Sequence, residues 1–270
     1  MIIVHDGKAH IDDFLATCIL LYKLDCKAYR TKFTQEHLSD PKYWVIDQGM
    51  DFNPELHNFD HHHIKEEICS ATMVMDYFYG KNYRDKFPTF RFIEIFDSYG
   101  PKAAAKFLNT TEEVLELSNN PICSAIIELF SNVSGELTDP LCSVMKEMGK
   151  SICCFIEKTD KLLKIVENGV EFVKFKDLTI INVLNCKLEN DVKIEELPTK
   201  KYCKINKIEA DIVLTKNSRG AGYRLISNNT DKIKFLQNEK CSFVHNSGFL
   251  VCFDKLEDYQ IIISEHSLIN

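Results

Sequence analysis

The sequence predicts an α/β protein whose N-terminal part is built on a mostly parallel sheet with flanking helices. Short apolar runs alternate with amphipathic stretches through the N-terminal half, which is the pattern of such sheets. Polar residues follow two of those runs directly, at His5 and Asp47. A long helical connection and then a series of strand-like runs follow, and they predict a smaller C-terminal α/β region.

The first strands and the first helix come from the spacing of apolar residues. We expect strands over 1–4, 27–33 and 43–46. A helix that starts near Asp12 and carries apolar residues through Tyr22 separates the first two strands. Ligands in α/β sheets bind outside the carboxyl ends of strands, so polar residues at those ends are candidates for function.

Two more helices are predicted before the middle of the chain. Ser70 is a candidate cap for a helix over 71–79, which Gly80 ends. A second helix is expected over 87–96, with Asp97 directly after it. Taken alone, Asp97 is open to two interpretations, a helix cap or a ligand, and the cap is the more frequent role.

The C-terminal half begins with helical spacing over 123–130 and 141–166. The second stretch carries an apolar stripe, which indicates a core helix or a spacer between domains. The stripe could equally face a partner subunit, so a homodimer remains an alternative. The members of the stripe are Met145, Met148, Ile152, Phe155, Leu162, Leu163 and Val166. Strands are expected over 170–175, 178–184, 211–214, 223–226 and in parts of 241–252. Residues 187–207, which are charged and contain Pro198, are expected to form a surface loop. The predicted domains are therefore 1–115, a helical connection over 116–169, and 170–270.

Composition limits the class of protein. The chain has 270 residues, of which 45% are hydrophobic, so a packed core is available. A net charge of −7 argues against wholesale coating of a nucleic acid backbone. It does not exclude a nuclease, because bound divalent metals supply local positive charge.

Cysteine usage and the N-terminus indicate a compartment. The 11 cysteines have no CxxC spacing, which favours reduced thiols. The N-terminus lacks the basic region of a signal peptide, and no apolar stretch is long enough to cross a bilayer. We expect a cytoplasmic protein without a membrane segment.

Histidines are concentrated near the N-terminus. Of the 9 in the chain, these lie in the first 63 residues: His5, His10, His37, His57, His61, His62 and His63. The densest stretch is Asp60-His61-His62-His63. Neutral imidazole and carboxylate are ligands of divalent metals, although a solvated polar loop remains the alternative for this stretch alone.

Four groups of acids and histidines stand in order along the chain. They are His5 with His10 and Asp12, then Asp47, then Asp60-His61-His62, then Asp97. Two divalent ions about 3.5–4 Å apart need about this number of ligands, with one carboxylate between them.

This order resembles the DHH phosphoesterase superfamily, whose motifs run His-plus-Asp, Asp, Asp-His-His, Asp. The first motif is more similar to that of one branch, the melanocyte-proliferating-gene (Myg-type) family of metal-dependent hydrolases and exonucleases. That family opens with His-Asn-Gly-x-Phe-His-x-Asp-Glu, and this chain has His5-Asp6-Gly7-Lys8-Ala9-His10-Ile11-Asp12-Asp13. The further matches are Asp47-Gln48-Gly49, Phe59-Asp60-His61-His62, Cys69-Ser70-Ala71, Asp97-Ser98-Tyr99-Gly100 and Phe243-Val244-His245-Asn246-Ser247-Gly248-Phe249. Asp6 and Ala9 depart from the family pattern.

The resemblance implies a role for each matched residue. The implied metal ligands are His5, His10, Asp12, Asp47, His61 and Asp97. Asp47 is the implied bridge between two ions, and Asp60 is expected to orient a histidine or to complete one ligand set. His62 is expected to contact substrate phosphate or to protonate the leaving oxygen. Asp13 is open to two roles, support of the ligands or an exposed helix-start acid, and the exposed role is favoured. His57, His63 and His37 are expected to be bystanders.

The C-terminal region is implied to bind substrate while the first domain binds metal. The loop His245, Asn246, Ser247 and Gly248 is the implied contact, since Gly248 permits close approach and its neighbours offer donors for phosphate. The alternative for Asn246-Ser247-Gly248 is a plain hairpin turn. Arg224 is the expected phosphate-binding cation, ahead of Arg219.

The resemblance therefore implies a metal-dependent phosphodiesterase, an exonuclease that cleaves RNA or short oligonucleotides from the 3′ end. Its cofactor would be two Mn²⁺ ions, with Mg²⁺ as an alternative, which activate a water for in-line attack on phosphorus. Two other functions remain open. One is hydrolysis of a small phosphoanhydride or cyclic dinucleotide, and the other is a catalytically silent metal-binding protein that acts by interaction.

Overall fold

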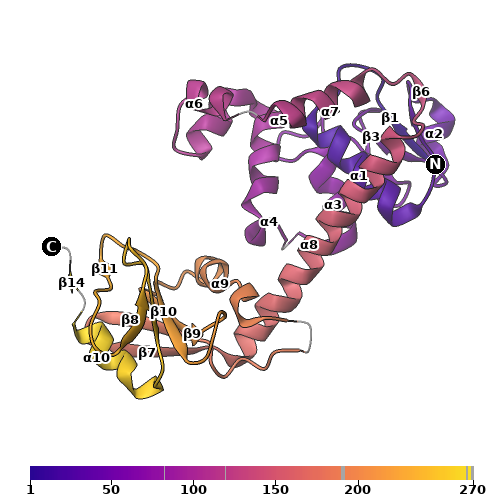
Figure 1. The fold of residues 1–270 in the computed structure, drawn as a ribbon. Helices are drawn as coiled ribbons and strands as arrows, with labels where there is room; N and C mark the ends of the chain where they lie inside the picture. The colour runs from indigo at the N-terminus through magenta and orange to yellow at the C-terminus, as the bar shows by residue number, and fades with distance from the viewer. Residues whose placement is uncertain (82, 119, 190–191, 266, 269–270) are drawn as a thin grey trace. The chain divides into compact units, whose positions relative to one another are not determined.

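The computed structural model describes residues 1–81, 83–118, 120–189, 192–265 and 267–268 (Figure 1). They divide into two compact units, Met1–Phe155 and Ile156–Asn270, and the boundary lies inside the long helix α8, Leu141–Gly169. The predicted division at residues 115 and 169 stays a prediction. No helix in the described part of the chain combines the length and the apolar character needed to cross a membrane.

Unit 1 contains the predicted parallel sheet. Its strands stand in the order β4-β5-β3-β1-β2-β6. Their bounds are Ile2–Val4 (β1), Ala28–Arg30 (β2), Trp44–Ile46 (β3), Phe52–Asn53 (β4), Asn58–Phe59 (β5) and Gly135–Glu136 (β6). The central pairs β5–β3, β3–β1 and β1–β2 are parallel, and the outer strands β4 and β6 pair antiparallel. The prediction of an α/β fold with a mostly parallel N-terminal sheet is confirmed.

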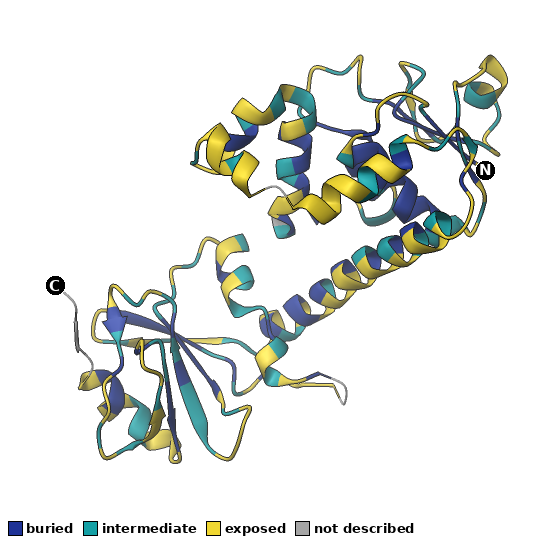
Figure 2. Cartoon of the chain, turned by 45° about the horizontal axis from the view of Figure 1, so that its top comes forward, coloured by how far each residue is buried: buried dark blue, intermediate teal, exposed yellow. Residues whose placement is uncertain are grey.

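Helices surround this sheet. Their bounds are Ile11–Leu24 (α1), Gln35–Ser39 (α2), Ser70–Tyr79 (α3), Tyr83–Lys86 (α4), Pro88–Phe107 (α5), Glu112–Leu117 (α6) and Pro121–Ser131 (α7). Helix α1 is buried along most of its length and packs against α3, α5 and α7. It lies next to the strands because its apolar residues face both the sheet and these helices. Figure 2 shows the buried strands in dark blue and the yellow solvent-facing sides of α6 and α7.

Unit 2 contains a second, mixed sheet with the strand order β12-β13-β10-β9-β8-β7. Its strands are Glu171–Phe175 (β7), Leu178–Asn182 (β8), Ile212–Lys216 (β9), Tyr223–Ser227 (β10), Cys241–Val244 (β12) and Leu250–Phe253 (β13). One face packs on α10, Tyr259–Ser264, through Leu225 and Ile263. The opposite face packs on the end of α8 and on α9, Thr199–Ile205, through Val213 and Val166. Short elements complete the unit: Ile194–Glu196 (η1), Ile233–Lys234 (β11), Leu256–Asp258 (η2) and Ser267–Leu268 (β14).

Three predictions about these elements are wrong in detail. Residues 187–207 are not all loop, because Pro198 precedes α9, whose Cys203 is buried; residues 190 and 191 of that range lie outside the described residues. Phe155 belongs to the predicted apolar stripe of α8, yet 58% of its surface is exposed. Asp97 does not follow a helix but lies within α5, which continues to Phe107 across a kink at Gly100.

Candidate metal centre

Three neighbouring strands of unit 1 end at the same edge of the sheet, and the residue after each strand is a candidate site residue. The parallel strands β1, β3 and β5 end at Val4, Ile46 and Phe59. The next residues are His5, Asp47 and Asp60. Since the carboxyl ends of adjacent parallel strands meet at the same edge, residues far apart in the sequence come together there.

His61 lies at the centre of one group of carboxylates. Its Nε2 is 3.0 Å from Asp97 Oδ2, 3.3 Å from Asp47 Oδ1 and 3.9 Å from Asp12 Oδ2. The imidazole is largely buried, with 11% of its side chain exposed. Burial lowers the pKa of His61, but hydrogen bonds with Asp47 and Asp97 outweigh it and raise that pKa to about 10. The protonated ring thus takes the place of a cation among these acids.

His5 and His10 form a second group on the other side of Asp47. His5 Nε2 is 3.4 Å from Asp47 Oδ2. The centroids of the two imidazole rings are 6.3 Å apart. One ligand atom from each of His5, His10 and Asp47 can be chosen so that all lie within 4.8 Å of one another. The same holds for Asp47 with His61 and His62, and for His10 with Asp12 and Asp97.

Asp47 therefore stands between two groups of ligand atoms. Its Oδ1 faces His61 and its Oδ2 faces His5. The residue is buried, with a backbone φ of 58° directly after β3. Burial raises the pKa of Asp47, but the contacts with His61 and His5 outweigh it and hold that pKa below the ordinary value. This is the arrangement required of a carboxylate that bridges two cations.

The burial and the missing hydrogen-bond partners of Asp12 indicate whether the site suits a metal. The side chain is fully buried at the start of α1, and neither carboxylate oxygen has a hydrogen-bond partner. Burial, with the nearby charges of Asp47 and Asp97, raises the pKa of Asp12 well above the ordinary value. A buried carboxylate without donors is costly unless a cation neutralises it. The donor set of carboxylates and imidazoles fits a divalent ion of the Mn²⁺ or Mg²⁺ kind.

Asp60 and His62 form a pair beside this cluster. Asp60 is 1% exposed, and its Oδ1 accepts hydrogen bonds from His62 Nδ1 at 2.6 Å and from His62 N at 3.0 Å. Its Oδ2 accepts from Met50 N at 2.6 Å. Both oxygens of Asp60 thus accept hydrogen bonds, and its orienting role stays a prediction. The side chain of His62 is 51% exposed.

Two supporting residues around Asp47 and Asp97 are not those the sequence analysis expected. Ser70 was predicted to cap α3, but the cap is Cys69, and the buried hydroxyl of Ser70 donates to Asp47 Oδ1 at 3.0 Å. Ser98, the residue after Asp97, donates to Ile68 O at 3.1 Å and so fixes α5 beside the segment that leads into α3.

Asp13 and Arg30 are further polar residues at the site. The favoured expectation that Asp13 is exposed is wrong, because it is fully buried and contacts Arg30 and the backbone of His10. Burial raises the pKa of Asp13 to about 7, although His5 and Arg30 act against that shift. Arg30 was missed; the one sequence signal for it was a cation at the end of a short apolar strand.

The remaining histidines are in other surroundings. His57 stacks on Trp44, with ring centroids 4.0 Å apart, and its Nδ1 is 2.7 Å from Pro41 O. His37 takes part in the capping of α2. His63 is exposed.

Of the predicted substrate-binding residues, His62 lies in unit 1 and the others lie in unit 2. Arg224 is on β10, and its Nη1 donates to Ser218 Oγ at 2.8 Å. Residues 245–249 join the antiparallel strands β12 and β13 and so form a hairpin connection. Within it, Gly248 N donates to His245 O, and Ser247 Oγ is 2.9 Å from His245 Nδ1.

Gly248 has a structural reason to be glycine. Its φ is 71°, and a Cβ there would lie 2.3 Å from Lys234 Cγ. Side chains are disfavoured at such a φ, and here there is no room for one either. A contact between Asn246 or Ser247 and substrate stays a prediction.

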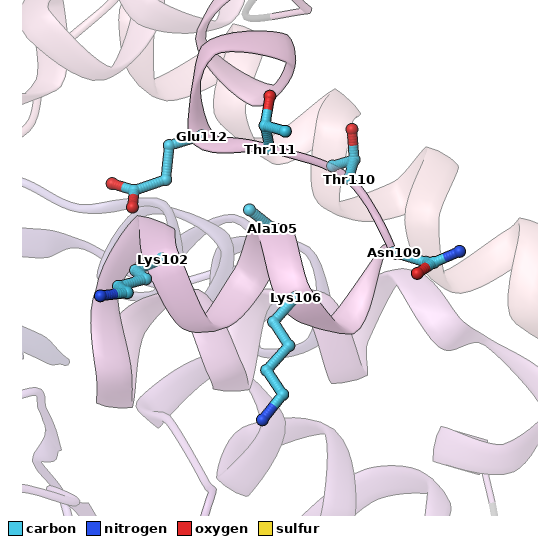
Figure 3. Close-up of a pocket in the computed structure, with 7 residues that line it drawn as sticks. All are labelled: Lys102, Ala105, Lys106, Asn109, Thr110, Thr111 and Glu112. Carbon is cyan, nitrogen blue, oxygen red and sulfur yellow. The ribbon is translucent and has the colours of Figure 1, made fainter.

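A surface hollow in unit 1 lies beyond the kink of α5 (Figure 3). It is lined by Lys102, Ala105, Lys106, Asn109, Thr110, Thr111 and Glu112. These residues come from the second part of α5 and the turn into α6, and none belongs to the histidine–aspartate cluster. The hollow has no part in the candidate site.

Fold and site together define an α/β protein with a cluster of buried carboxylates and partly exposed imidazoles at the strand ends of its parallel sheet. Residues 1–86 match the model of a family designated MYG1_exonuc and described as an uncharacterised protein family (UPF0160). That stretch contains His5, His10, Asp12, Asp47 and His61, whereas Asp97 and all of unit 2 lie outside it. The match supports the resemblance to the melanocyte-proliferating-gene family over this stretch. No curated protein and no solved structure matches the chain.

Proposed function

We propose that the chain is a metal-dependent phosphodiesterase that removes nucleotides from the 3′ end of RNA or short oligonucleotides. The observation that carries this proposal is the position of Asp47, whose two oxygens face two different groups of ligand atoms. The designation of the family that matches residues 1–86 points to an exonuclease, which gives the substrate class.

The candidate ligands surround Asp47. His61, Asp12 and Asp97 would hold one ion, and His5 and His10 would hold the other, with His10 also within ligand distance of Asp12 and Asp97. When bound, such a pair of ions supplies Lewis-acid stabilisation of the phosphorane charge and lowers the pKa of a water from about 15.7 toward about 7.

His62 and Asp60 provide the proton transfer. Asp60 accepts a hydrogen bond from His62 Nδ1, which fixes the ring and leaves Nε2 as the nitrogen available for chemistry. We assign to Nε2 the proton that the leaving oxygen takes up when the P–O bond breaks. Arg224 and residues 245–248 of unit 2 are the proposed contacts to substrate phosphate.

The test uses the full chain loaded with Mn²⁺ and three substrates: 5′-end-labelled RNA, pyrophosphate and a cyclic dinucleotide. We expect a ladder of labelled RNA products that shorten from the 3′ end. Metal bound without any RNA product would contradict the proposal. Product from pyrophosphate or the cyclic dinucleotide alone would support the small-molecule alternative, and no product from any of the three would support a metal-binding interaction protein.

Asp47→Asn is the decisive variant. Asparagine is tolerated at the left-handed φ of this position, so the fold should persist while one bridging oxygen is lost. Mn²⁺ affinity, measured by calorimetry, should fall by more than the roughly 10–100-fold that loss of an outer-shell partner causes. RNA cleavage should disappear with it. Asp6→Asn makes the same chemical change on an exposed residue and should leave both quantities unchanged.

A further inference from the structure

The loop between β1 and α1 carries two candidate ligands, His5 and His10, and its backbone is held from three sides. Different elements supply the partners: β2, α7 and the first turn of α1. The hydrogen bonds are Arg30 Nη2 to Gly7 O at 2.6 Å, Ala9 N to Ser131 Oγ at 3.0 Å, and His10 N to Asp13 Oδ1 at 2.9 Å. A loop fastened in this way keeps its histidines in one orientation.

Asp13 also reaches the side chain of His5. Its Oδ2 is 3.6 Å from His5 Nδ1, just beyond hydrogen-bond distance, and this buried Nδ1 has no hydrogen-bond partner among the described residues. The other ring nitrogen, His5 Nε2, is 3.4 Å from Asp47 Oδ2. His5 therefore lies between a carboxylate that belongs to the candidate ligand set and one that does not.

Arg30 supports Asp13 from behind. The guanidinium has no exposed surface and lies over the ring of Phe130, 4.3 Å from its centroid. Its Nη1 donates to Asp13 Oδ2 at 3.4 Å. A guanidinium only donates hydrogen bonds, so this contact favours the ionised form of Asp13, which can only accept.

We propose that Asp13 and Arg30 are positioning residues that set the tautomer of His5. Asp13 Oδ2 is the carboxylate oxygen beside the buried, unpartnered Nδ1 of His5. A small approach would let it accept the Nδ1–H, so that Nε2 presents its lone pair to an ion held together with Asp47. Outer carboxylates act on metal-bound histidines in this way elsewhere, by fixing the ring and raising its basicity. The inference rests on the proposed function in that an ion binds at His5.

The first experiment needs neither metal nor activity. The full chain is labelled with ¹⁵N on histidine, kept metal-free, and its ring tautomers are read from long-range ¹H–¹⁵N spectra. The His5 signals are assigned by their loss in His5→Gln. We expect a proton on His5 Nδ1 in the metal-free protein, where Nε2 faces the Asp47 carboxylate. A His5 ring protonated on Nε2 alone would overturn the inference.

The second experiment changes the positioning residue. In Asp13→Asn the carboxamide oxygen still accepts from His10 N, but its NH₂ now faces His5 Nδ1 and favours the opposite tautomer. We expect the tautomer signal to switch and the Mn²⁺ affinity to fall roughly 10–100-fold. Asp6→Asn, in the same loop but exposed, is the matched control and should change neither.

Arg30→Lys provides a second route if Asp13→Asn does not fold. Lysine keeps the charge but cannot hold Gly7 O and Asp13 with one planar group, so we expect a partial loss of Mn²⁺ affinity. Unchanged tautomer and affinity in the folded variants would overturn the inference. A wild type that shows the expected tautomer but binds no Mn²⁺ would contradict the proposed function and leave the contact between Asp13 and His5 in place.

Discussion

At the scale of single residues, the site is a cluster of charges that the protein alone does not balance. Asp12 is buried without a hydrogen-bond donor, whereas Asp47 has Ser70 and two histidines around it. The difference follows from position, since Asp47 lies between two groups of ligand atoms and Asp12 belongs to one group, with His10 and Asp97, at the start of α1. An arrangement of this kind favours cation binding at the expense of the stability of the metal-free protein.

Asp12→Asn should separate these two effects. Removal of the buried charge should increase the free energy of unfolding of the metal-free protein by about 1–3 kcal/mol near pH 8. The urea midpoint should rise accordingly. The variant should also lose the stabilisation that Mn²⁺ gives to the wild type. Fluorescence of Trp44, the single tryptophan, follows the unfolding of unit 1. A metal-free variant less stable than the wild type would contradict this account.

The stability of the metal-free wild type should depend on pH with a defined sign. The pKa of Asp12 is raised, that of Asp13 is raised to about 7, and that of His61 is raised to about 10. In each case the folded state binds the proton more tightly than the unfolded state, so stability falls as pH rises between the two pKa values. The urea midpoint should therefore be higher near about pH 5 than near about pH 8.

Mn²⁺ should reverse this trend, because its ligands must be deprotonated and its affinity grows with pH. The measurement is the Trp44 midpoint at a series of pH values, with Mn²⁺ and with a chelator. A metal-free midpoint that rises steadily across this range would show that other groups govern the titration.

At the scale of elements, strand ends and one helix kink assemble the site. Strands β1, β3 and β5 deliver three of the motifs, and α5 delivers the fourth. Asp97 lies in α5 shortly before Gly100, which has φ 78° and ψ −178°, a conformation that is essentially restricted to glycine. Helix α5 can therefore end its first part at the ligand cluster and continue in another direction.

Gly100→Ala should test this role of the kink. No atom lies within 4 Å of the added Cβ, so the strain comes from the backbone alone and should lower stability by about 1–3 kcal/mol. Because relief of that strain moves Asp97, the Mn²⁺ affinity should fall as well. Gly80→Ala is the matched control, since Gly80 has φ 73° at the end of α3 and also has no atom within 4 Å of a Cβ. It should lower stability and leave Mn²⁺ affinity unchanged. Equal effects on affinity in both variants would contradict a specific role for the kink.

At the scale of the whole molecule, the candidate ligands all belong to unit 1, and the predicted substrate contacts other than His62 belong to unit 2. Each unit has its own core, the first around the parallel sheet and the second on both faces of the mixed sheet. Metal binding and substrate binding are thus separable properties of one chain.

Hydrogen–deuterium exchange should show this separation. Mn²⁺ should slow exchange in the segments around residues 5–13, 47–62 and 91–98, because the ion links them. Strands β8, β9 and β10 should exchange at the same rate with and without Mn²⁺. Comparable protection of both units by the metal alone would contradict the assignment of the ligands to unit 1.

Much of the fold could be predicted because its signals are local. The apolar runs at β1 and β3 and the helical spacing of α1 and α8 depend on neighbours in the sequence. The errors arose where tertiary contacts decide. Asp13 has the sequence context of an exposed helix-start acid, and only the approach of Arg30 from β2 explains its burial. Ser70 has the context of a cap, and only the proximity of Asp47 gives its hydroxyl another partner.

The sequence by itself determined which residues are candidate metal ligands, because His5, His10, Asp12, Asp47, His61 and Asp97 are of the types that bind divalent ions wherever the chain places them. Only the tertiary structure decided which oxygen of Asp47 faces which histidine, and which acids are left without donors. The physical reason is that ligand identity is a property of the residue, whereas burial and distance are properties of the packing around it.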